Sequence, residues 1–294
     1  MINNFPFHNV EKRPWPIFLS FRLLGALLNS VFYFHSFVSF FFPLFFFFFV
    51  ILKTWMWWDN VIIERNFGFH NNFLVKNFFI GMILMIISEV FFFSRFFWRF
   101  FHNCWFPRKE IGSIWPPKGL NPILVDSFSI PFLKTIILLS SGVTVTFAHH
   151  SLQKKKNKQF IFGLQRTIFL GLLFLFLQNF EYIKSLFSFK TMVYGSCFYM
   201  LTGFHGAHVI VGTIFLFICY FRTKKVQNIP SHHVGFTLAI WYWHFVDVVW
   251  LFLFLFVYWY TTLCYTFNLK KNLLFTPIIC LFWQSIKKKN FVYI

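Results

Sequence analysis

The fold class of this chain is decided by residues 232–260, HHVGFTLAIWYWHFVDVVWLFLFLFVYWY. A run of roughly 20 apolar residues is long enough to cross a bilayer as a helix. This run nevertheless keeps His244 and Asp247 in its interior, and a central aspartate costs on the order of 2.5–3.5 kcal/mol on membrane-insertion scales. The two residues are three apart, so on a helix they share a face and can pair. We interpret the pair as an internal hydrogen bond that fixes helix packing, with a proton-handling or ligand-binding role as the alternative.

Composition points to the same class of protein. Of the 294 residues, 58% are hydrophobic and only 12% are charged. Soluble domains carry about 25% charged residues, so the chain is expected to be a polytopic membrane protein. The formal net charge of +19 comes mostly from basic residues between the apolar runs. Such charges orient membrane helices and attract anionic lipid head groups, and we therefore expect no nucleic-acid binding.

Seven apolar runs predict seven transmembrane helices, because an isolated strand would leave its backbone groups unpaired in lipid. They cover about residues 17–37, 38–56, 78–104, 129–148, 160–180, 192–221 and 234–260. Only His35, Ser36 and Ser39 separate the first two runs, which predicts a tight helical hairpin. A polar loop with Trp58 and Glu64 is expected to follow. The predicted fold class is all-α, a polytopic membrane helix bundle.

Four segments are expected along the chain. They are an N-terminal segment 1–16, the first two helices with their following loop 17–77, a five-helix bundle 78–262 and a C-terminal extension 263–294. The apolar run 273–283 is too short to span a bilayer and is expected at the interface or against a neighbouring subunit. The loops expected on the same side of the membrane as the N-terminus carry eleven basic residues, and those expected on the other side carry five. The C-terminal tail adds five lysines to that other side. The N-terminus is therefore expected on the inner side.

Glu89 lies near mid-bilayer, since it is about eleven residues into its helix and hence ~16 Å deep. Desolvation disfavours the charged form of an unpaired carboxyl, so we expect Glu89 to carry a proton. It is a candidate proton-relay or regulatory group; the alternative is a protonated carboxyl hydrogen-bonded to a neighbouring helix. Arg95 and Arg99 share a face roughly 100° away from Glu89 and are not expected to neutralise it.

Seven histidines raise the question of a metal site, because imidazole suits haem iron, copper or zinc. They are His149, His150, His205, His208, His232, His233 and His244. His205 and His208 share a helical face, but no Glu-x-x-His motif accompanies them, which disfavours a di-iron bundle. The five cysteines form no CxxC pair. We expect no metal ligand on this chain.

A cluster at the inner surface suits a phospholipid better than a metal. Trp58, Glu64 and His70 follow the second apolar run, and Arg222 ends the sixth. Arginine and histidine bind phosphate, and tryptophan covers glycerol and acyl carbons. An ordinary solvated loop is the alternative. The sequence has no Gly-rich phosphate loop and no Ser/His/Asp constellation, so no catalytic residue is predicted.

Several motifs occur in the order known from one protein family. They are WW at 57–58, VIIE at 61–64, GMILMIISEVFFF from Gly81, WPPKG from Trp115, SGVTVTFAHHSL from Ser141, VYGSCFYMLTGFHGAHVIVGTIFL from Val193 and SHHVGFTLAIWYWHFVDVVWLFL from Ser231. On these motifs the chain resembles subunit III of mitochondrial cytochrome c oxidase, a haem–copper oxidase complex. An independent membrane carrier or haem-binding cytochrome is the alternative.

The resemblance implies seven helices, the first two splayed from the other five around a V-shaped cleft filled with phospholipids. It implies a core subunit that binds no haem or copper, those cofactors lying in partner subunits. Such a subunit packs against catalytic subunit I and other oxidase subunits, supports proton uptake and protects turnover from inactivation. The implied location is the mitochondrial inner membrane, with the N-terminus on the matrix side. Oxidation of cytochrome c by oxygen, with proton pumping, is the activity of the whole complex.

The family's functional residues map onto matching positions of this sequence. Its intramembrane carboxylate corresponds to Glu89. Its lipid contacts, to phosphatidylglycerol, phosphatidylethanolamine or cardiolipin, correspond to Trp58, Glu64, His70, His208 and Arg222. The sequence departs from the family at Arg95 and Arg99, which replace small residues and suggest contact with an unusual partner or a lipid phosphate. The tail after Tyr260 has no family counterpart, so it is expected to touch lineage-specific subunits.

Overall fold

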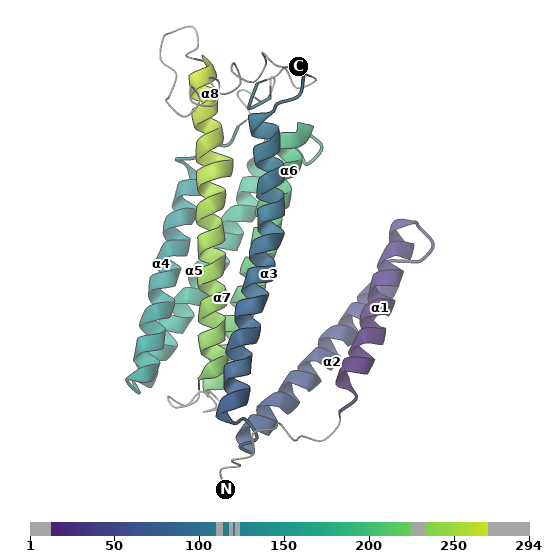
Figure 1. Cartoon of the computed structure of the whole chain (residues 1–294), viewed down its shortest axis with the longest axis vertical. Helices are drawn as coiled ribbons and strands as arrows, with labels where there is room; N and C mark the ends of the chain where they lie inside the picture. Colours follow the sequence, from purple (N-terminus) through teal and green to yellow (C-terminus); the bar gives the residue numbers. More distant parts are fainter. Residues whose placement is uncertain (1–12, 110–113, 118–119, 121–123, 225–232, 270–294) are drawn as a thin grey trace, which may run out of the picture. The chain divides into compact units, whose positions relative to one another are not determined.

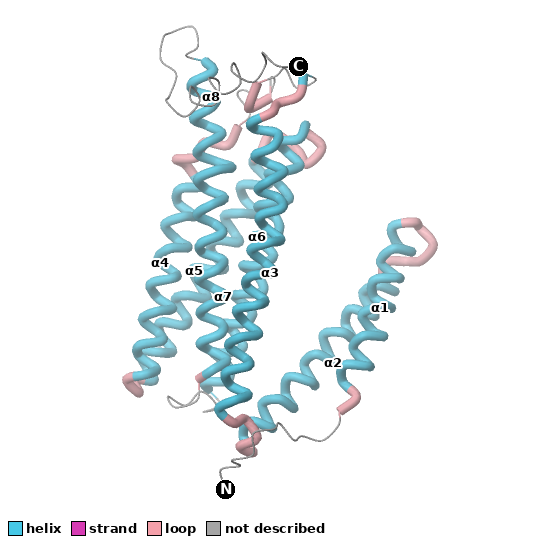
Figure 2. The backbone as a smooth tube through the Cα atoms, in the orientation of Figure 1, coloured by secondary structure: helices cyan, strands magenta, loops and turns pink. Residues whose placement is uncertain are grey.

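The computed structural model describes residues 13–109, 114–117, 120, 124–224 and 233–269. All regular structure in these residues is helical (Figures 1 and 2). The elements are α1 (Trp15–Phe34), α2 (Phe41–Asn66), α3 (Asn72–Trp105), α4 (Ile130–Gln153), α5 (Asn157–Lys184), α6 (Met192–Lys224), α7 (Val234–Leu253), the π-helical segment η2 (Phe254–Tyr260) and α8 (Thr261–Leu269). In this described part, seven helical stretches are long and apolar enough to cross a membrane, the last formed by α7, η2 and the start of α8. The predicted all-α class with seven spans is confirmed.

Local sequence signals explain several helix ends. Proline occupies the first turn of α1 and of α4, where its missing N–H would have no helical partner. Ser36 and Lys155, with φ of 62° and 59°, adopt the left-handed conformation just after α1 and α4. A residue in this conformation stops a helix and turns the chain back. The predicted hairpin between the first two spans is thereby confirmed, with its turn at residues 35–40.

The predicted helix ends were wrong in several places. Helix α2 continues to Asn66, so Trp58 and Glu64 lie on a helix and not in the expected loop. Helix α3 begins at Asn72, six residues before its apolar run, and α8 carries the last span on to Leu269. Hydropathy marks the part of a helix that lies in lipid, whereas helical hydrogen bonding continues through the head-group layer into polar residues. The apolar run 273–283 lies outside the described residues.

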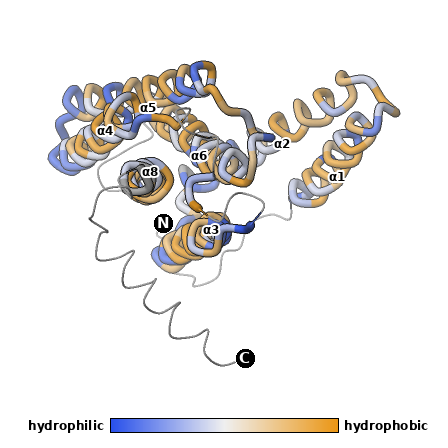
Figure 3. Tube along the Cα trace, turned by 90° about the horizontal axis from the view of Figure 1, so that it is seen from above, coloured by the Kyte–Doolittle hydropathy of each residue, from blue (hydrophilic) through white to orange (hydrophobic). Residues whose placement is uncertain are grey.

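The chain divides into two compact units, Met1–Gly81 and Met82–Ile294, and each is described by itself. In the first unit, α1 and α2 cross closely at Gly25, where a Cβ atom would lie 2.6 Å from the ring of Phe46. The Arg13 guanidinium lies 3.0 Å from the Glu64 carboxylate, which links the start of α1 to the end of α2. Most large apolar side chains on both helices are exposed, and hydrophobic residues line both in Figure 3. Such surfaces are suited to lipid or to other apolar helices.

The second unit is a bundle built around α7. Trp243 and Trp250 of α7 are fully buried. Gly171 of α5 and Gly212 of α6 make room for the Trp243 ring, because added Cβ atoms would lie 2.8 and 3.0 Å from it. The Trp243 indole donates a hydrogen bond to Ser141 Oγ on α4, at 2.9 Å. Small residues and interhelical hydrogen bonds are the usual means of packing helices in membranes, and here they fix α4, α5 and α6 around one indole.

Candidate functional site

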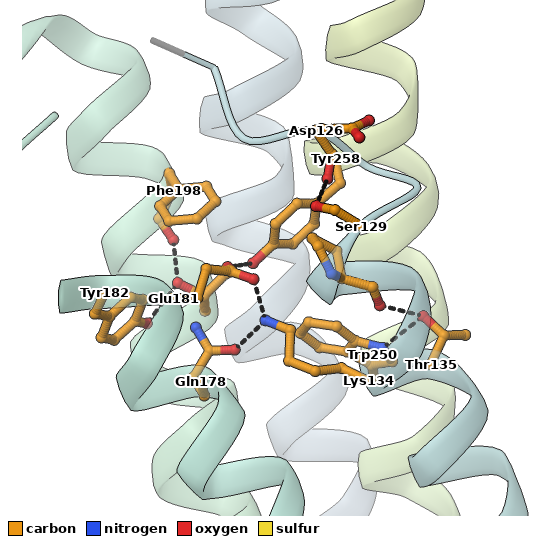
Figure 4. A network of polar contacts seen from close by, with 12 residues as sticks. Asp126, Ser129, Lys134, Thr135, Gln178, Glu181, Tyr182, Phe198, Trp250 and Tyr258 are labelled. Carbon is orange, nitrogen blue, oxygen red and sulfur yellow. Dashed lines mark hydrogen bonds and ion pairs between the residues drawn. The ribbon is translucent and has the colours of Figure 1, made fainter. Parts of the chain in front are cut away.

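A fully buried ion pair joins α4 to α5 in the second unit (Figure 4). The Lys134 Nζ lies 2.7 Å from Glu181 Oε2, and the two side chains are 0% and 3% exposed. Lys134 also donates to Gln178 Oε1 at 2.7 Å. The Tyr258 hydroxyl, on η2, donates to Glu181 Oε1 at 2.6 Å. Each charged group is therefore paired with the opposite charge and makes one further hydrogen bond within an apolar interior.

Aromatic rings complete the surroundings of the lysine. Its Nζ lies 4.7 Å from the centroid of the Trp250 ring, 5.4 Å from that of Tyr258 and 5.9 Å from that of Phe174. Cation–π attraction at such distances is worth about 2 kcal/mol when the cation is desolvated. Removing one partner of a buried ion pair costs roughly 3–5 kcal/mol, because the other charge stays buried and uncompensated. We interpret this group as a structural link between α4, α5 and η2.

Sequence reasoning did not identify this pair. Lys134 is the fifth residue of α4, and Glu181 lies three residues before the end of α5. The predicted fifth span ended at residue 180, which placed Glu181 just outside the membrane. A lysine inside a predicted span was the available signal, since such a charge requires a partner.

Glu89 is paired with His208 across α3 and α6. The Glu89 Oε2 lies 2.9 Å from His208 Nε2. On its other side, His208 Nδ1 lies 2.7 Å from the Phe204 carbonyl oxygen. A carbonyl only accepts hydrogen bonds, so Nδ1 carries a proton and donates it. The contact between Nε2 and Oε2 is a hydrogen bond between the imidazole and the carboxyl group.

The surroundings of this pair are apolar but incompletely closed. The His208 side chain is 16% exposed and the Glu89 side chain 27%. The His208 ring lies 5.1 Å from the Phe93 ring and 6.4 Å from the stacked ring of Tyr242, centroid to centroid. Glu89 is thus hydrogen-bonded to a neighbouring helix in this geometry, and its role as a proton-relay or regulatory group stays a prediction.

The residues predicted to bind lipid are distributed over both units. In the first unit Trp58 is 57% exposed, Glu64 pairs with Arg13, and the His70 ring meets the Phe78 ring edge-on. In the second unit Arg222 lies 14 residues beyond His208 on α6, or about 21 Å along the helix. His208 and Arg222 therefore do not converge on one phosphate. Their lipid-binding roles stay predictions.

Arg222 lies where α6 and α7 approach each other. Its Nη1 atom is 3.1 Å from the position that a Cβ atom on Gly235, at the start of α7, would take. A side chain at residue 235 would press against the guanidinium. The glycine therefore leaves room for Arg222 at this end of the bundle.

The predicted pair His244 and Asp247 lies on α7 against α4. The His244 Nδ1 is 3.6 Å from Asp247 Oδ2, which is longer than a hydrogen bond. Asp247 is buried, and a Cβ atom on Gly142 of α4 would lie 2.8 Å from Oδ2. In the described part of the chain, Asp247 Oδ1 has no hydrogen-bond partner. The pair is thus an electrostatic contact at a helix interface, and its role as a packing device stays a prediction.

Six of the seven candidate metal-ligating histidines lie in the part of the chain that the structure describes. Among the residues that the structure describes, no group of three or more His, Cys, Asp or Glu side chains is placed to hold a metal ion. His149 contacts the His233 ring, at 5.4 Å between centroids, while His205 Nε2 lies 3.2 Å from the Val246 carbonyl oxygen. His232 lies outside the described residues.

Known proteins that this chain resembles share one family description. The family model described as cytochrome c oxidase subunit III matches residues 5–262. The protein named cytochrome c oxidase subunit 3 in Rhipicephalus sanguineus is 46% identical to this chain over 256 residues. The aligned region covers 87% of this chain and 98% of the relative. The Marchantia polymorpha protein of that name is 47% identical over 257 residues, 87% of this chain and 96% of its own. That of Myxine glutinosa is 46% identical over 257 residues, 86% and 97% of the two chains.

Proposed function

Because this chain belongs to the cytochrome c oxidase subunit III family, and so is a subunit of an oxidoreductase complex, we propose that it supports proton uptake by the complex. Its partners are other oxidase subunits, and it is a multi-pass membrane protein. We further propose that it packs against catalytic subunit I, that haem and copper lie in partner subunits, and that the complex is in the mitochondrial inner membrane. The N-terminus would face the matrix.

The observation that carries the proton role is the contact between Glu89 Oε2 and His208 Nε2. The two atoms are 2.9 Å apart, which is within the reach of general acid–base proton transfer. The Phe204 carbonyl fixes the imidazole through Nδ1. Partial exposure gives water or a partner group access to the carboxyl. The pair would therefore hold a proton at mid-membrane and release it during turnover.

We also propose that the chain holds phospholipids through Trp58, Glu64, His70, His208 and Arg222. In the first unit, the Arg13–Glu64 pair presents both charge signs close together. A guanidinium suits a lipid phosphate, and a carboxylate suits the ammonium of phosphatidylethanolamine. Exposed Trp58 has the amphipathic ring that lies at membrane interfaces.

The proton role is tested in the assembled oxidase with Glu89→Gln and His208→Gln. Proton uptake during turnover, followed with a pH-sensitive dye in a stopped-flow instrument, should slow several-fold. The haem and copper absorption spectra should stay unchanged. Asp126→Asn is the matched control, because Asp126 is an exposed carboxylate outside the helices. Uptake equal to wild type in both variants would contradict the proposal, and a stoichiometric haem on the purified chain would support a cytochrome instead.

A further inference from the structure

One face of α3 carries cations that the proposed function does not use. Arg95, Trp98, Arg99 and His102 follow one another at helical spacing, so they share a face. All four are exposed, and together they line a surface cleft of about 290 Å³. We call these four residues the α3 basic face.

The two guanidinium groups lack an anionic partner within the protein. Among the described residues, neither Arg95 nor Arg99 has a carboxylate within ion-pair distance. Glu89, the nearest acid on the same helix, is paired with His208. Like charges four residues apart on a helix repel each other. An anion bound between the arginines would relieve this repulsion.

The level of the α3 basic face in the membrane fits a lipid head group. The 34 residues of α3 make a helix about 51 Å long, well beyond the ~30 Å hydrocarbon core. Arg95 lies ten residues before the end of α3 at Trp105, and Arg99 and His102 lie nearer still. Long arginine side chains extend from such depths toward the head-group layer. Exposed Trp98 is the residue type that marks this interface.

The same stripe of α3 continues toward mid-membrane as an apolar surface. Leu84, Ile87 and Phe91 precede Arg95 at intervals of three or four residues, and all three are exposed. An apolar stripe that ends in two arginines has the polarity of a phospholipid, with acyl chains along one part and a phosphate at the other. A carboxylate from a partner protein would pair with the arginines, but it would not account for the exposed apolar stripe beside them.

We propose that the α3 basic face binds one anionic phospholipid, with its phosphate between Arg95 and Arg99. Guanidinium forks bind phosphate oxygens in pairs, which gives geometric specificity as well as charge. His102 lies one turn beyond the arginines and reaches the remaining polar part of the head group. The acyl chains lie along Leu84, Ile87 and Phe91. The site uses none of the residues Trp58, His70 and Arg222, so its test does not depend on their proposed lipid contacts.

Native mass spectrometry of the delipidated, assembled oxidase tests this site. Wild-type complex and the double variant Arg95→Gln/Arg99→Gln are titrated with dioleoyl-phosphatidylglycerol and with dioleoyl-phosphatidylcholine. The double variant should bind one phosphatidylglycerol fewer, with the affinity of that site reduced at least about tenfold, and its phosphatidylcholine binding should be unchanged. Arg166→Gln is the matched control, because Arg166 is an exposed, lone arginine ten residues into α5.

Three results would overturn the proposal. The first is equal phosphatidylglycerol binding by wild type and double variant, and the second is an equal loss in Arg166→Gln. The third is loss of a partner subunit with an unchanged lipid count, which would assign the arginines to a protein contact. Should the double variant not assemble, spin-labelled phosphatidylglycerol and phosphatidylcholine are compared on the wild-type complex at low and high salt. A salt-sensitive preference for phosphatidylglycerol supports the site, and no preference contradicts it.

Discussion

Two charge pairs in the second unit differ in how completely the protein surrounds them. Lys134 and Glu181 are 0% and 3% exposed and have further hydrogen bonds from Gln178 and Tyr258. His208 and Glu89 are 16% and 27% exposed and lie 2.9 Å apart, atom to atom. The first pair is enclosed, whereas the second is partly open. This difference in enclosure supports our proposal that the second pair, unlike the first, exchanges a proton during turnover.

The largest expected effect is on the enclosed pair. Lys134→Met leaves Glu181 buried without its cation, which should cost roughly 3–5 kcal/mol and lower the amount of assembled oxidase. The measurement is the temperature at which the purified complex loses this subunit. The double variant Lys134→Met/Glu181→Gln is the control, because it removes both charges and should recover most of the loss. A double variant as unstable as the single one would contradict the pairing.

A smaller effect is expected when one hydrogen bond of the enclosed group is removed. Tyr258→Phe deletes the hydroxyl that donates to Glu181 at 2.6 Å but leaves the ion pair with Lys134 in place. The loss should be about 1–3 kcal/mol, as for other hydrogen bonds to charged groups. The same dissociation assay measures it, with Tyr33→Phe as the control, because the Tyr33 side chain is exposed. A Tyr258→Phe variant as unstable as Lys134→Met would show that the hydroxyl, and not the lysine, compensates the carboxylate.

The smallest stability effect is expected for the open pair. Glu89→Gln keeps a hydrogen-bonding side chain toward His208, so stability should change by no more than one hydrogen bond, about 1 kcal/mol. Proton uptake should nevertheless fall. This combination of normal assembly and impaired uptake distinguishes a proton-handling pair from a structural one. Failure of the variant to assemble would place Glu89 in the same class as Glu181.

The seven spans were predictable because membrane length and low polarity are local properties of the sequence. The pairing of polar groups was not. Glu89 and His208 lie on helices whose contact cannot be read from the apolar runs, and the predicted fifth span ended one residue before Glu181, four residues short of the end of α5. Helix ends such as that of α2, which carries Trp58 and Glu64, exceeded the apolar runs because helical hydrogen bonding does not stop where lipid does. Which polar residues pair between helices depends on how each helix is rotated about its axis and packed. Apolar runs in the sequence do not give this information.

Carbodiimide labelling of the intact wild-type complex, followed by peptide mapping, tests the contrast between the two pairs most directly. Carbodiimides attack protonated carboxyls that they can reach in apolar surroundings. Glu89, which contacts His208 and is 27% exposed, should be modified, whereas Glu181, paired with Lys134 and enclosed, should not. Glu89→Gln should abolish the label on this chain. Equal modification of Glu181, or labelling unchanged by Glu89→Gln, would contradict the assignment of the open pair as the proton-handling group.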